Sequence, residues 1–307
     1  MKQETRNFYQ AAVRRSIEWI TGHLDEALDL EDLARDAALS PFHFHRVFRG
    51  MVGETPLELH RRLALERSAW TLLHTDQRIT MIAFDAGYET HESFTRAFRD
   101  RYGRSPSEFR RASAPGAADC APPQRFELAS KAGIHFVPLG GAPSMIHFIV
   151  GDRRMQADIR EQPALRVATL RHRGPYNQIG EAFGRLGGIA GPAGLFRPGA
   201  VMIAIYHDDP DSVAAAELRS DAGVVVPDGA PMPAGLTEVQ VPGGRYAVAT
   251  HTGSYEGLGD AWSRLMGEWL PQSGERVRDS VSYEIYRNTP MDTPKEKLIT
   301  EIYVPLG

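Results

Sequence analysis

The chain has 307 residues, of which 42% are apolar and 24% charged, and these values are ordinary for a globular protein with about two domains. No run of 18 or more apolar residues occurs, which excludes a helical membrane span, and the single cysteine, Cys120, excludes an internal disulfide. The charged N-terminal segment lacks the apolar core of a secretory signal. We therefore expect a cytoplasmic protein. The net charge of −4 argues against indiscriminate nucleic-acid binding.

The charge is unevenly placed along the chain. Residues 37–111 contain 12 Arg and 9 Asp or Glu, whereas residues 114–307 contain 18 Lys or Arg and 22 Asp or Glu. A protein that contacts phosphates through one part only has this kind of asymmetry. The contrast is mild and decides little by itself.

The stretch LSPFHFHRVFR at 39–49 predicts a helix that begins at Ser40 and Pro41. Spacing at i, i+3, i+4 and i+7 assigns one face to the core: Phe44, Val47, Phe48 and Met51. His43 and His45 are two residues apart and diverge on a helix, whereas a zinc pair needs a spacing of four, so we expect no metal. His43 is predicted to be solvated. The remaining face is either a DNA-reading surface or an ordinary solvated one.

This helix belongs to a duplicated unit. Residues 30–59 match residues 79–109 at an offset of 49 to 50, and each copy reads as a short helix, a turn and a second helix. Residues 58–75 predict a long helix between the copies. Two such units in one chain place two helices on successive major-groove segments about 34 Å apart without a dimer.

Residues 12–111 resemble the DNA-binding domain of the AraC/XylS family of bacterial transcription regulators. The matching motifs are LxxLAxxAxLSPFHFHRxFR, RRLALERSAWTLL and ITxIAxxAGYETHESFTRAFRxRYGRSPSEFR. The resemblance implies binding to double-stranded operator DNA through two major-groove helices, and a nucleoid-associated location when bound. RNA polymerase is a further expected partner, and no cofactor is expected.

The resemblance also implies roles for single residues. Arg46 and Arg96 are expected to bind guanine, and Glu92 to accept from cytosine. Phe42 contacts a thymine methyl or packs in the core. The expected base-reading residues are Phe42, His45 and Arg46 on the first helix and Glu92, Ser93 and Arg96 on the second. Phosphate contacts are expected from Arg49 and Arg99.

The second half of the chain begins after an Ala/Pro-rich stretch at 112–125, which reads as a linker. We divide the chain into a DNA-binding domain at 1–112, a linker with an unassigned segment at 113–156, and an effector domain at 157–307. Residues 166–186 match residues 245–265 at an offset of 79. The predicted fold is thus an all-α double helix-turn-helix domain followed by an α+β domain of two duplicated βαββ units, with a ligand cleft between the copies.

Strand alternation indicates what lines that cleft. Glu284 and Tyr286 share one face of their strand, as do Glu301 and Tyr303 of theirs, while Tyr206 opposes Ile203 and Ile205. If the Ile and Val faces pack on the helices, the opposite faces present two carboxylates and several aromatic rings, which suit a cationic aromatic guest. The alternative is a solvated outer sheet face.

Residues 157–305 resemble the GyrI-like (gyrase-inhibitor-like) effector-binding domain, carried by the two HxGxY motifs and by YEIYRNTP…LITEIYVPL. The resemblance implies an amphipathic or cationic small-molecule effector and a binding role for Glu284, with Glu301 as a second acid. The expected effector-binding residues are Glu284, Tyr286, Glu301, Tyr303, Tyr206, Tyr176, Tyr255, Trp262 and Phe183. We predict no catalytic residue and no enzyme activity. The alternatives are a GyrI-like hydrolase or sequestering protein that uses Glu284, and a module that binds another protein.

Overall fold

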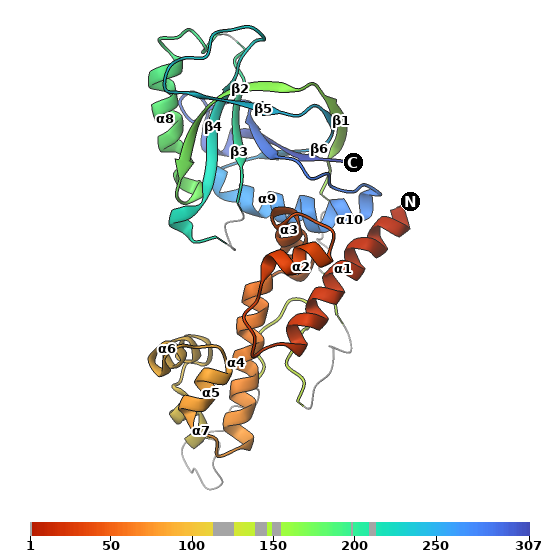
Figure 1. Cartoon of the computed structure of the whole chain (residues 1–307), viewed down its shortest axis with the longest axis vertical. Helices are drawn as coiled ribbons and strands as arrows, with labels where there is room; N and C mark the ends of the chain where they lie inside the picture. Colours follow the sequence, from red (N-terminus) through yellow and green to blue (C-terminus); the bar gives the residue numbers. More distant parts are fainter. Residues whose placement is uncertain (1, 113–125, 139–145, 149–154, 198, 209–212) are drawn as a thin grey trace. The chain divides into compact units, whose positions relative to one another are not determined.

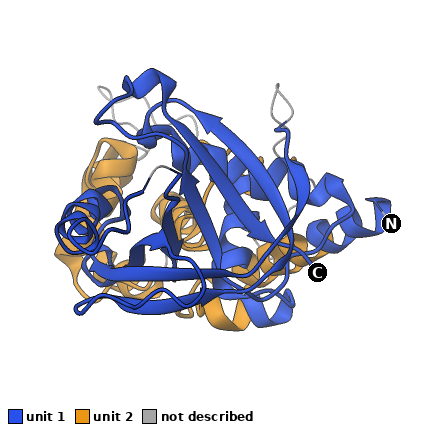
Figure 2. Ribbon diagram, turned by 90° about the horizontal axis from the view of Figure 1, so that it is seen from above, with its two compact units in different colours: residues 1–10, 34–51, 150–307 blue, residues 11–33, 52–149 orange. Residues whose placement is uncertain are grey.

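The computed structural model describes residues 2–112, 126–138, 146–148, 155–197, 199–208 and 213–307. The predicted linker beyond residue 112, with Cys120, lies outside these ranges. The chain forms two compact units, residues 1–10, 34–51 and 150–307 (unit 1) and residues 11–33 and 52–149 (unit 2) (Figure 2). Within the described ranges, no helix is both long and apolar enough to cross a bilayer.

The N-terminal half is helical, as its periodicity predicts (Figure 1). Its helices are α1 (Lys2–Gly22), α2 (Leu30–Asp36), α3 (Pro41–Val52), α4 (Pro56–His74), α5 (Ile79–Asp85), α6 (His91–Tyr102) and α7 (Pro106–Ala112). The two helix-turn-helix copies are α2–α3 and α5–α6. The turn of the second copy needs Gly87 at φ 78°, and Ala38 occupies the matching place of the first copy at φ 53°.

Local signals fix the ends of the helices in unit 2. Thr55 and Glu58 form a reciprocal capping box at the start of α4, with Pro56 in the first turn. Thr90 caps α6 at the Ser93 N–H, and Gly103 ends the helix with φ 70°. The core of this unit joins α4 to α7, and its largest members are Leu65, Leu72, Phe94, Phe98 and Phe109.

Residues 126–136, for which the sequence predicts no role, are fastened to α4 by a buried carboxylate. Glu66 is fully buried and accepts hydrogen bonds from the Leu128 and Phe136 backbone N–H groups, both at 2.9 Å. Arg62 also donates to Glu66 at 2.7 Å. A buried charge that is paired and hydrogen-bonded in this way holds the segment in one position.

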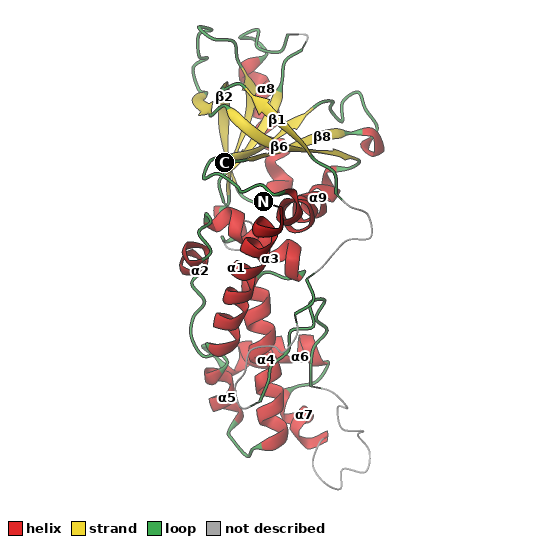
Figure 3. Ribbon diagram, turned by 90° about the vertical axis from the view of Figure 1, so that its right-hand side faces the viewer, coloured by secondary structure: helices red, strands yellow, loops and turns green. Residues whose placement is uncertain are grey.

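The β-rich half is one antiparallel sheet with helices (Figures 1 and 3). Its first elements are β1 (Asp158–Gln162), β2 (Leu165–Arg173), α8 (Ile179–Ala190), β3 (Met202–Tyr206) and β4 (Arg219–Val225). The second set is β5 (Thr237–Val241), β6 (Gly244–Thr252), α9 (Leu258–Arg264), a π-helical turn (Leu265–Trp269), α10 (Leu270–Ser273), β7 (Ser282–Tyr286) and β8 (Ile299–Pro305). The predicted duplication is present, and each βαββ copy is preceded by one further strand, β1 or β5.

The strand order makes the duplication symmetric. It runs β1-β6-β8-β7-β3-β4-β2-β5, so that exchanging the copies reverses the list and leaves it unchanged. A pseudo-two-fold axis therefore passes between β3 and β7. Each added edge strand pairs with the other copy's side of the sheet, β1 with β6 for example, which ties the two copies into one sheet.

The Gly223 position in β4 tests how tightly the sheet packs. A methyl group there would lie 2.6 Å from Val167 Cγ1 and 3.2 Å from Ile203 Cγ2, whereas a methyl group at Gly184 in α8 meets no heavy atom within 4 Å. We expect Gly223→Ala to lower the free energy of unfolding by about 1–3 kcal/mol. Gly184→Ala should raise it slightly, by up to about 1 kcal/mol. Denaturant unfolding of both variants measures the difference, and equal stabilities would contradict the packing.

Candidate effector site and DNA-reading helices

Glu284 lies on the helix-bearing face of the sheet. Ser282, Glu284 and Tyr286 alternate onto one face of β7, and register pairs this face with Ala204 and Tyr206 of β3. The same face packs on α8. The condition that the Ile and Val faces pack on the helices fails for β3 and β7, because Ile203, Ile205 and Ile285 belong to a separate cluster of strand side chains. In β8 the Ile face does share the helix-bearing face, since Ile302 pairs in register with Glu284.

The Glu284 carboxylate is held by three neutral donors. The residue is 2% exposed. Its Oε1 accepts from Trp262 Nε1 at 2.7 Å, and its Oε2 accepts from the hydroxyls of Tyr206 at 2.8 Å and Tyr286 at 2.9 Å. These are all the bonds of Glu284 found in the described part of the chain. The three donors provide hydrogen bonds to both carboxylate oxygens, but none of them carries a charge that would balance the carboxylate.

The two tyrosines remain protonated donors at neutral pH. Burial, and then the negative charge of Glu284, raise the pKa of Tyr206 and of Tyr286 well above 10. Their hydroxyls also lie 3.3 Å from each other. The arrangement is a fixed set of O–H and N–H groups that converge on one carboxylate.

Further aromatic rings surround this carboxylate. The ring of Tyr176 lies 4.8 Å from that of Tyr206, and the rings of Phe183 and Tyr255 lie 5.5 and 5.4 Å from that of Tyr286, centroid to centroid. The Glu284 cluster is defined here as Glu284, Tyr206, Tyr286, Trp262, Tyr176, Phe183 and Tyr255. Negative ring faces around a buried carboxylate favour a cation.

The duplication explains why this cluster holds a single charge. At the repeat offsets, Tyr206 matches Tyr286, Phe183 matches Trp262, and Tyr176 matches Tyr255. The mate of Glu284 is Ala204, which is also its register partner across the pseudo-two-fold axis. The aromatic rings of the Glu284 cluster are thus related by the duplication, whereas its negative charge comes from one copy alone.

The HxGxY histidines have a structural role. His172 Nε2 lies 3.1 Å from the Pro175 carbonyl oxygen, and His251 Nε2 lies 2.9 Å from that of Ser254. Gly174 supplies the intervening left-handed turn at φ 130°. Each motif thereby closes the turn that carries its tyrosine onto the sheet.

Glu301 and Tyr303 are not brought to the Glu284 cluster. Glu301 pairs in register with Ile285, so its side chain lies on the opposite face of the sheet from Glu284. It is paired with Arg160 at 3.0 Å and Arg287 at 2.6 Å, and the Tyr303 hydroxyl donates to it at 2.7 Å. These contacts satisfy its charge within the protein.

The second helix-turn-helix exposes the side that is predicted to read DNA. Glu92, Arg96 and Arg99 on α6 are exposed at i, i+4 and i+7, and Ser93 is half-buried. Phe94 and Phe98 are fully buried on the other side, as predicted. Because α3 and α6 belong to different units, the spacing of the two helices stays a prediction.

The first reading helix is not free. The Arg46 guanidinium carbon lies 4.2 Å from the ring centroid of Trp262 and 4.6 Å from that of Phe42. His43 Nε2 lies 3.2 Å from Ser282 Oγ. The prediction that His43 is solvated is wrong, since it is 1% exposed, and His45 is 2% exposed rather than available on an open face. Arg49 is exposed. Periodicity alone gives no sign of these contacts.

Two family models match the chain, a helix-turn-helix domain at residues 33–112 and a GyrI-like small molecule binding domain at residues 155–306. Regulatory protein SoxS of Salmonella typhimurium is 33% identical over 102 residues, which are 33% of this chain and 95% of SoxS. The chain belongs to the AraC-type helix-turn-helix regulators. It carries a GyrI-like domain behind its DNA-binding half.

Other relatives of this AraC-type regulator share only part of its length. The HTH-type transcriptional regulator YbfP of Bacillus subtilis is 39% identical over 103 residues, which are 34% of this chain and 35% of YbfP. The chain thus spans about a third of that relative. The crystal structure of the EcmrR C-terminal domain is 21% identical, with a TM-score of 0.44, and covers 50% of this chain and 98% of that domain.

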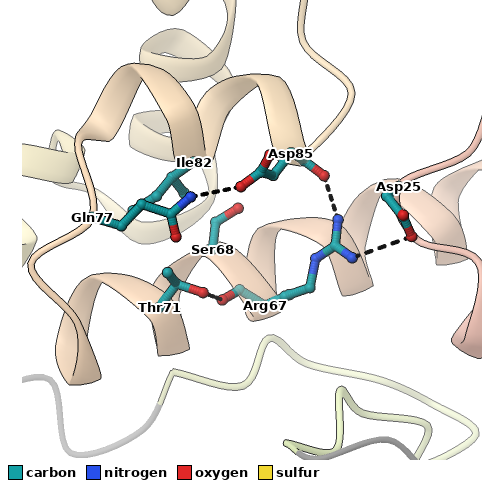
Figure 4. Close-up of a pocket in the computed structure, with 7 residues that line it drawn as sticks. All are labelled: Asp25, Arg67, Ser68, Thr71, Gln77, Ile82 and Asp85. Carbon is teal, nitrogen blue, oxygen red and sulfur yellow. Dashed lines mark hydrogen bonds and ion pairs between the residues drawn. The ribbon is translucent and has the colours of Figure 1, made fainter.

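A cavity of about 240 Å³ lies elsewhere in the regulator, within unit 2 (Figure 4). Its polar groups are bonded to one another. Arg67 donates to the Leu24 and Asp85 carbonyls and lies 3.7 Å from the Asp25 carboxylate, and Gln77 donates to the Asp85 carboxylate at 2.6 Å. These bonds fasten α5 to α4. The cavity is lined by Asp25, Arg67, Ser68, Thr71, Gln77, Ile82 and Asp85.

The burial of His43 predicts a pH dependence of stability. Burial, and then the positive charge of Arg46, lower the pKa of His43 to about 4 from its usual 6.5. The neutral ring's contribution to stability is therefore fully present above pH 6.5 and is lost as the pH falls towards 4. Between pH 7 and pH 5 we expect this residue to lower the free energy of unfolding by about 2 kcal/mol. Denaturant unfolding at both pH values, with His43→Gln as the control that removes this component, is the measurement. An unchanged pH dependence in His43→Gln would contradict the assignment.

Proposed function

We propose that this protein is a ligand-responsive transcription regulator that acts in the cytoplasm. Its helix-turn-helix units, within the proposed domain at 1–112, read an operator in double-stranded DNA. Its effector domain, proposed at 157–307, binds a small cationic aromatic molecule. RNA polymerase is the partner through which an operator-bound regulator of this kind produces its output.

The exposed side of α6 supports the DNA reading. Arg96 presents a guanidinium fork suited to guanine O6 and N7, and Glu92 presents an acceptor suited to the cytosine amino group. Arg99 lies one turn from Arg96, towards the C-terminal end of α6, and suits a phosphate, which positions the helix without specifying sequence. The protein's overall negative charge makes such specific contacts more important, because non-specific attraction to DNA is weak.

The effector chemistry rests on one observation, the buried Glu284 carboxylate bonded only by neutral donors within the described residues. Burying a carboxylate without a counter-ion is costly, so a cation that enters the Glu284 cluster recovers electrostatic free energy. The rings of Tyr206, Tyr286 and Trp262 add cation–π attraction of about 0.5–2 kcal/mol each. A neutral aromatic molecule gains only the packing.

The same geometry favours binding over catalysis. A general base must accept a proton from a substrate or water within about 3 Å. Here Oε1 of Glu284 accepts from Trp262, and Oε2 accepts from two tyrosines. Both oxygens are thus already engaged by donors of the protein, as in a site that holds a carboxylate for binding. We therefore propose a binding role for Glu284 in place of the hydrolase alternative.

Charge selectivity tests the effector site. Phenyltrimethylammonium and tert-butylbenzene have nearly the same shape and differ in charge. We expect Glu284→Gln to weaken phenyltrimethylammonium binding about tenfold or more and to leave tert-butylbenzene unchanged, because only the cation interacts with the carboxylate. Ligand NMR titration gives both affinities. Glu301→Gln is the matched control and should retain cation binding. Equal losses for the two ligands in Glu284→Gln would refute the charge assignment.

Sequence preference tests the reading helix. With a DNA site selected from a random library by the unaltered protein, Arg96→Ala should cost about 1–3 kcal/mol and relax the preference at one base pair. Arg99→Ala should weaken binding to all sequences alike and reduce the salt dependence by about one ion. Mobility-shift titrations at several salt concentrations distinguish the two effects. Full sequence preference in Arg96→Ala would show that α6 is not the reader.

A further inference from the structure

Helix α3 lies beside α9, which carries Trp262 of the Glu284 cluster, and both belong to unit 1 (Figure 1). Phe42 packs against the same core cluster as Tyr206 and Tyr286, and its ring lies 6.0 Å, edge to face, from that of Trp262. Arg46, one turn along, places its guanidinium over the same indole ring. The indole N–H in turn donates to Glu284. An aromatic ring and a cation from α3 thus already lie against the aromatic wall of this site.

The approach of α3 depends on two glycines. A methyl group at Gly267, in the π-helical turn after α9, would lie 2.2–2.5 Å from backbone atoms of Gly50. A methyl group at Gly50 would lie 2.4 Å from the Ser263 carbonyl oxygen. Backbone atoms cannot move aside as side chains can, so only glycine permits this contact. The hydrogen bond between His43 and Ser282 completes the docked face.

The docked face overlaps the base-reading face. Phe42 and Arg46 are two of the three residues that the AraC-type pattern assigns to base reading on this helix. A guanidinium that lies on the Trp262 ring is not at the same time on a guanine edge. Docked α3 therefore excludes its own reading of DNA.

We propose that α3 is an internal occupant of the effector site, with Phe42 and Arg46 in the places of the aromatic and cationic parts of the effector. This inference rests on the proposed function of the Glu284 cluster. An effector that takes those places displaces α3, and the displaced helix is free to enter the major groove. Effector and DNA then both select the undocked state, so each raises the affinity for the other.

The glycine contact provides a test that leaves the ring and charge groups intact. Gly267→Ala forces α3 away from the effector domain. If the docked state dominates, this variant should bind the selected DNA site about tenfold more tightly than the unaltered protein. It should also bind phenyltrimethylammonium about tenfold more tightly in the absence of DNA. Adding the cation should increase DNA affinity in the unaltered protein and have little further effect in Gly267→Ala.

Gly259→Ala is the matched control, because Gly259 is an exposed position of α9 and a methyl group there meets no heavy atom within 4 Å. It should behave as the unaltered protein. Arg46→Ala should act in opposite directions, strengthening cation binding by removing the internal competitor and weakening DNA binding by removing a base contact. A loss of structure alone lowers both affinities. Circular dichroism checks that each variant is folded. Gly50→Ala places the methyl group on α3 instead of on the effector domain and should have the same effects as Gly267→Ala.

The cation measurement without DNA keeps the two hypotheses distinct. A folded Gly267→Ala or Gly50→Ala variant with unchanged or lower cation affinity overturns the docking proposal, whatever the DNA result. Tighter cation binding in Gly267→Ala, together with no selection of a DNA sequence by this undocked variant, supports α3 as the occupant and refutes the regulator function instead.

Discussion

The buried carboxylate of Glu284 is the constraint on which the effector domain depends. A charge that is 2% exposed and that, within the described residues, accepts hydrogen bonds from neutral donors alone is stable only while Trp262, Tyr206 and Tyr286 hold their positions. Those three side chains come from α9, β3 and β7, so one carboxylate ties both copies of the duplication together. Under the proposed function, the same charge gives the site its preference for cations.

The two faces of the sheet differ in whether both copies of the duplication carry an acidic residue. On the face away from the helices, both copies keep a satisfied acid: Asp221 is paired with Arg171 at 2.5 Å and with His207 at 2.6 Å, and its mate Glu301 is paired with two arginines. On the helix-bearing face, Ala204 stands opposite Glu284, and among the described residues of the Glu284 cluster no second acid is present. A symmetric scaffold therefore carries one asymmetric charge, which suits a small guest that binds across the pseudo-two-fold axis.

Helix α3 has twelve residues and makes three kinds of contact. Phe44, Val47 and Phe48 are fully buried and hold the helix in its core. Gly50 lets it approach another backbone, and Arg46 lies on an aromatic ring of the effector domain. Helix α6 has the same core pattern but keeps its arginines exposed. The two copies of one motif thus differ in what covers the side that is predicted to read DNA. Under our proposal, this difference is the route by which a small molecule influences DNA binding.

The sequence alone determined the features that follow from local periodicity and from repetition. These features are the long helix before residue 75, the two helix-turn-helix units, the duplicated β units, and the buried side chains of Phe44, Phe48, Phe94 and Phe98. Each can be read from the spacing of nearby residues or from a repeat offset. Alternation also placed Glu284 and Tyr286 on one face of their strand.

Only the tertiary structure decided which face the helices cover, because alternation defines two faces without saying which is covered. It also separated Glu301 from Glu284 and buried His43 against Ser282, a partner 239 residues away. Such contacts depend on packing between distant segments, and neither residue carries a local sign of the other.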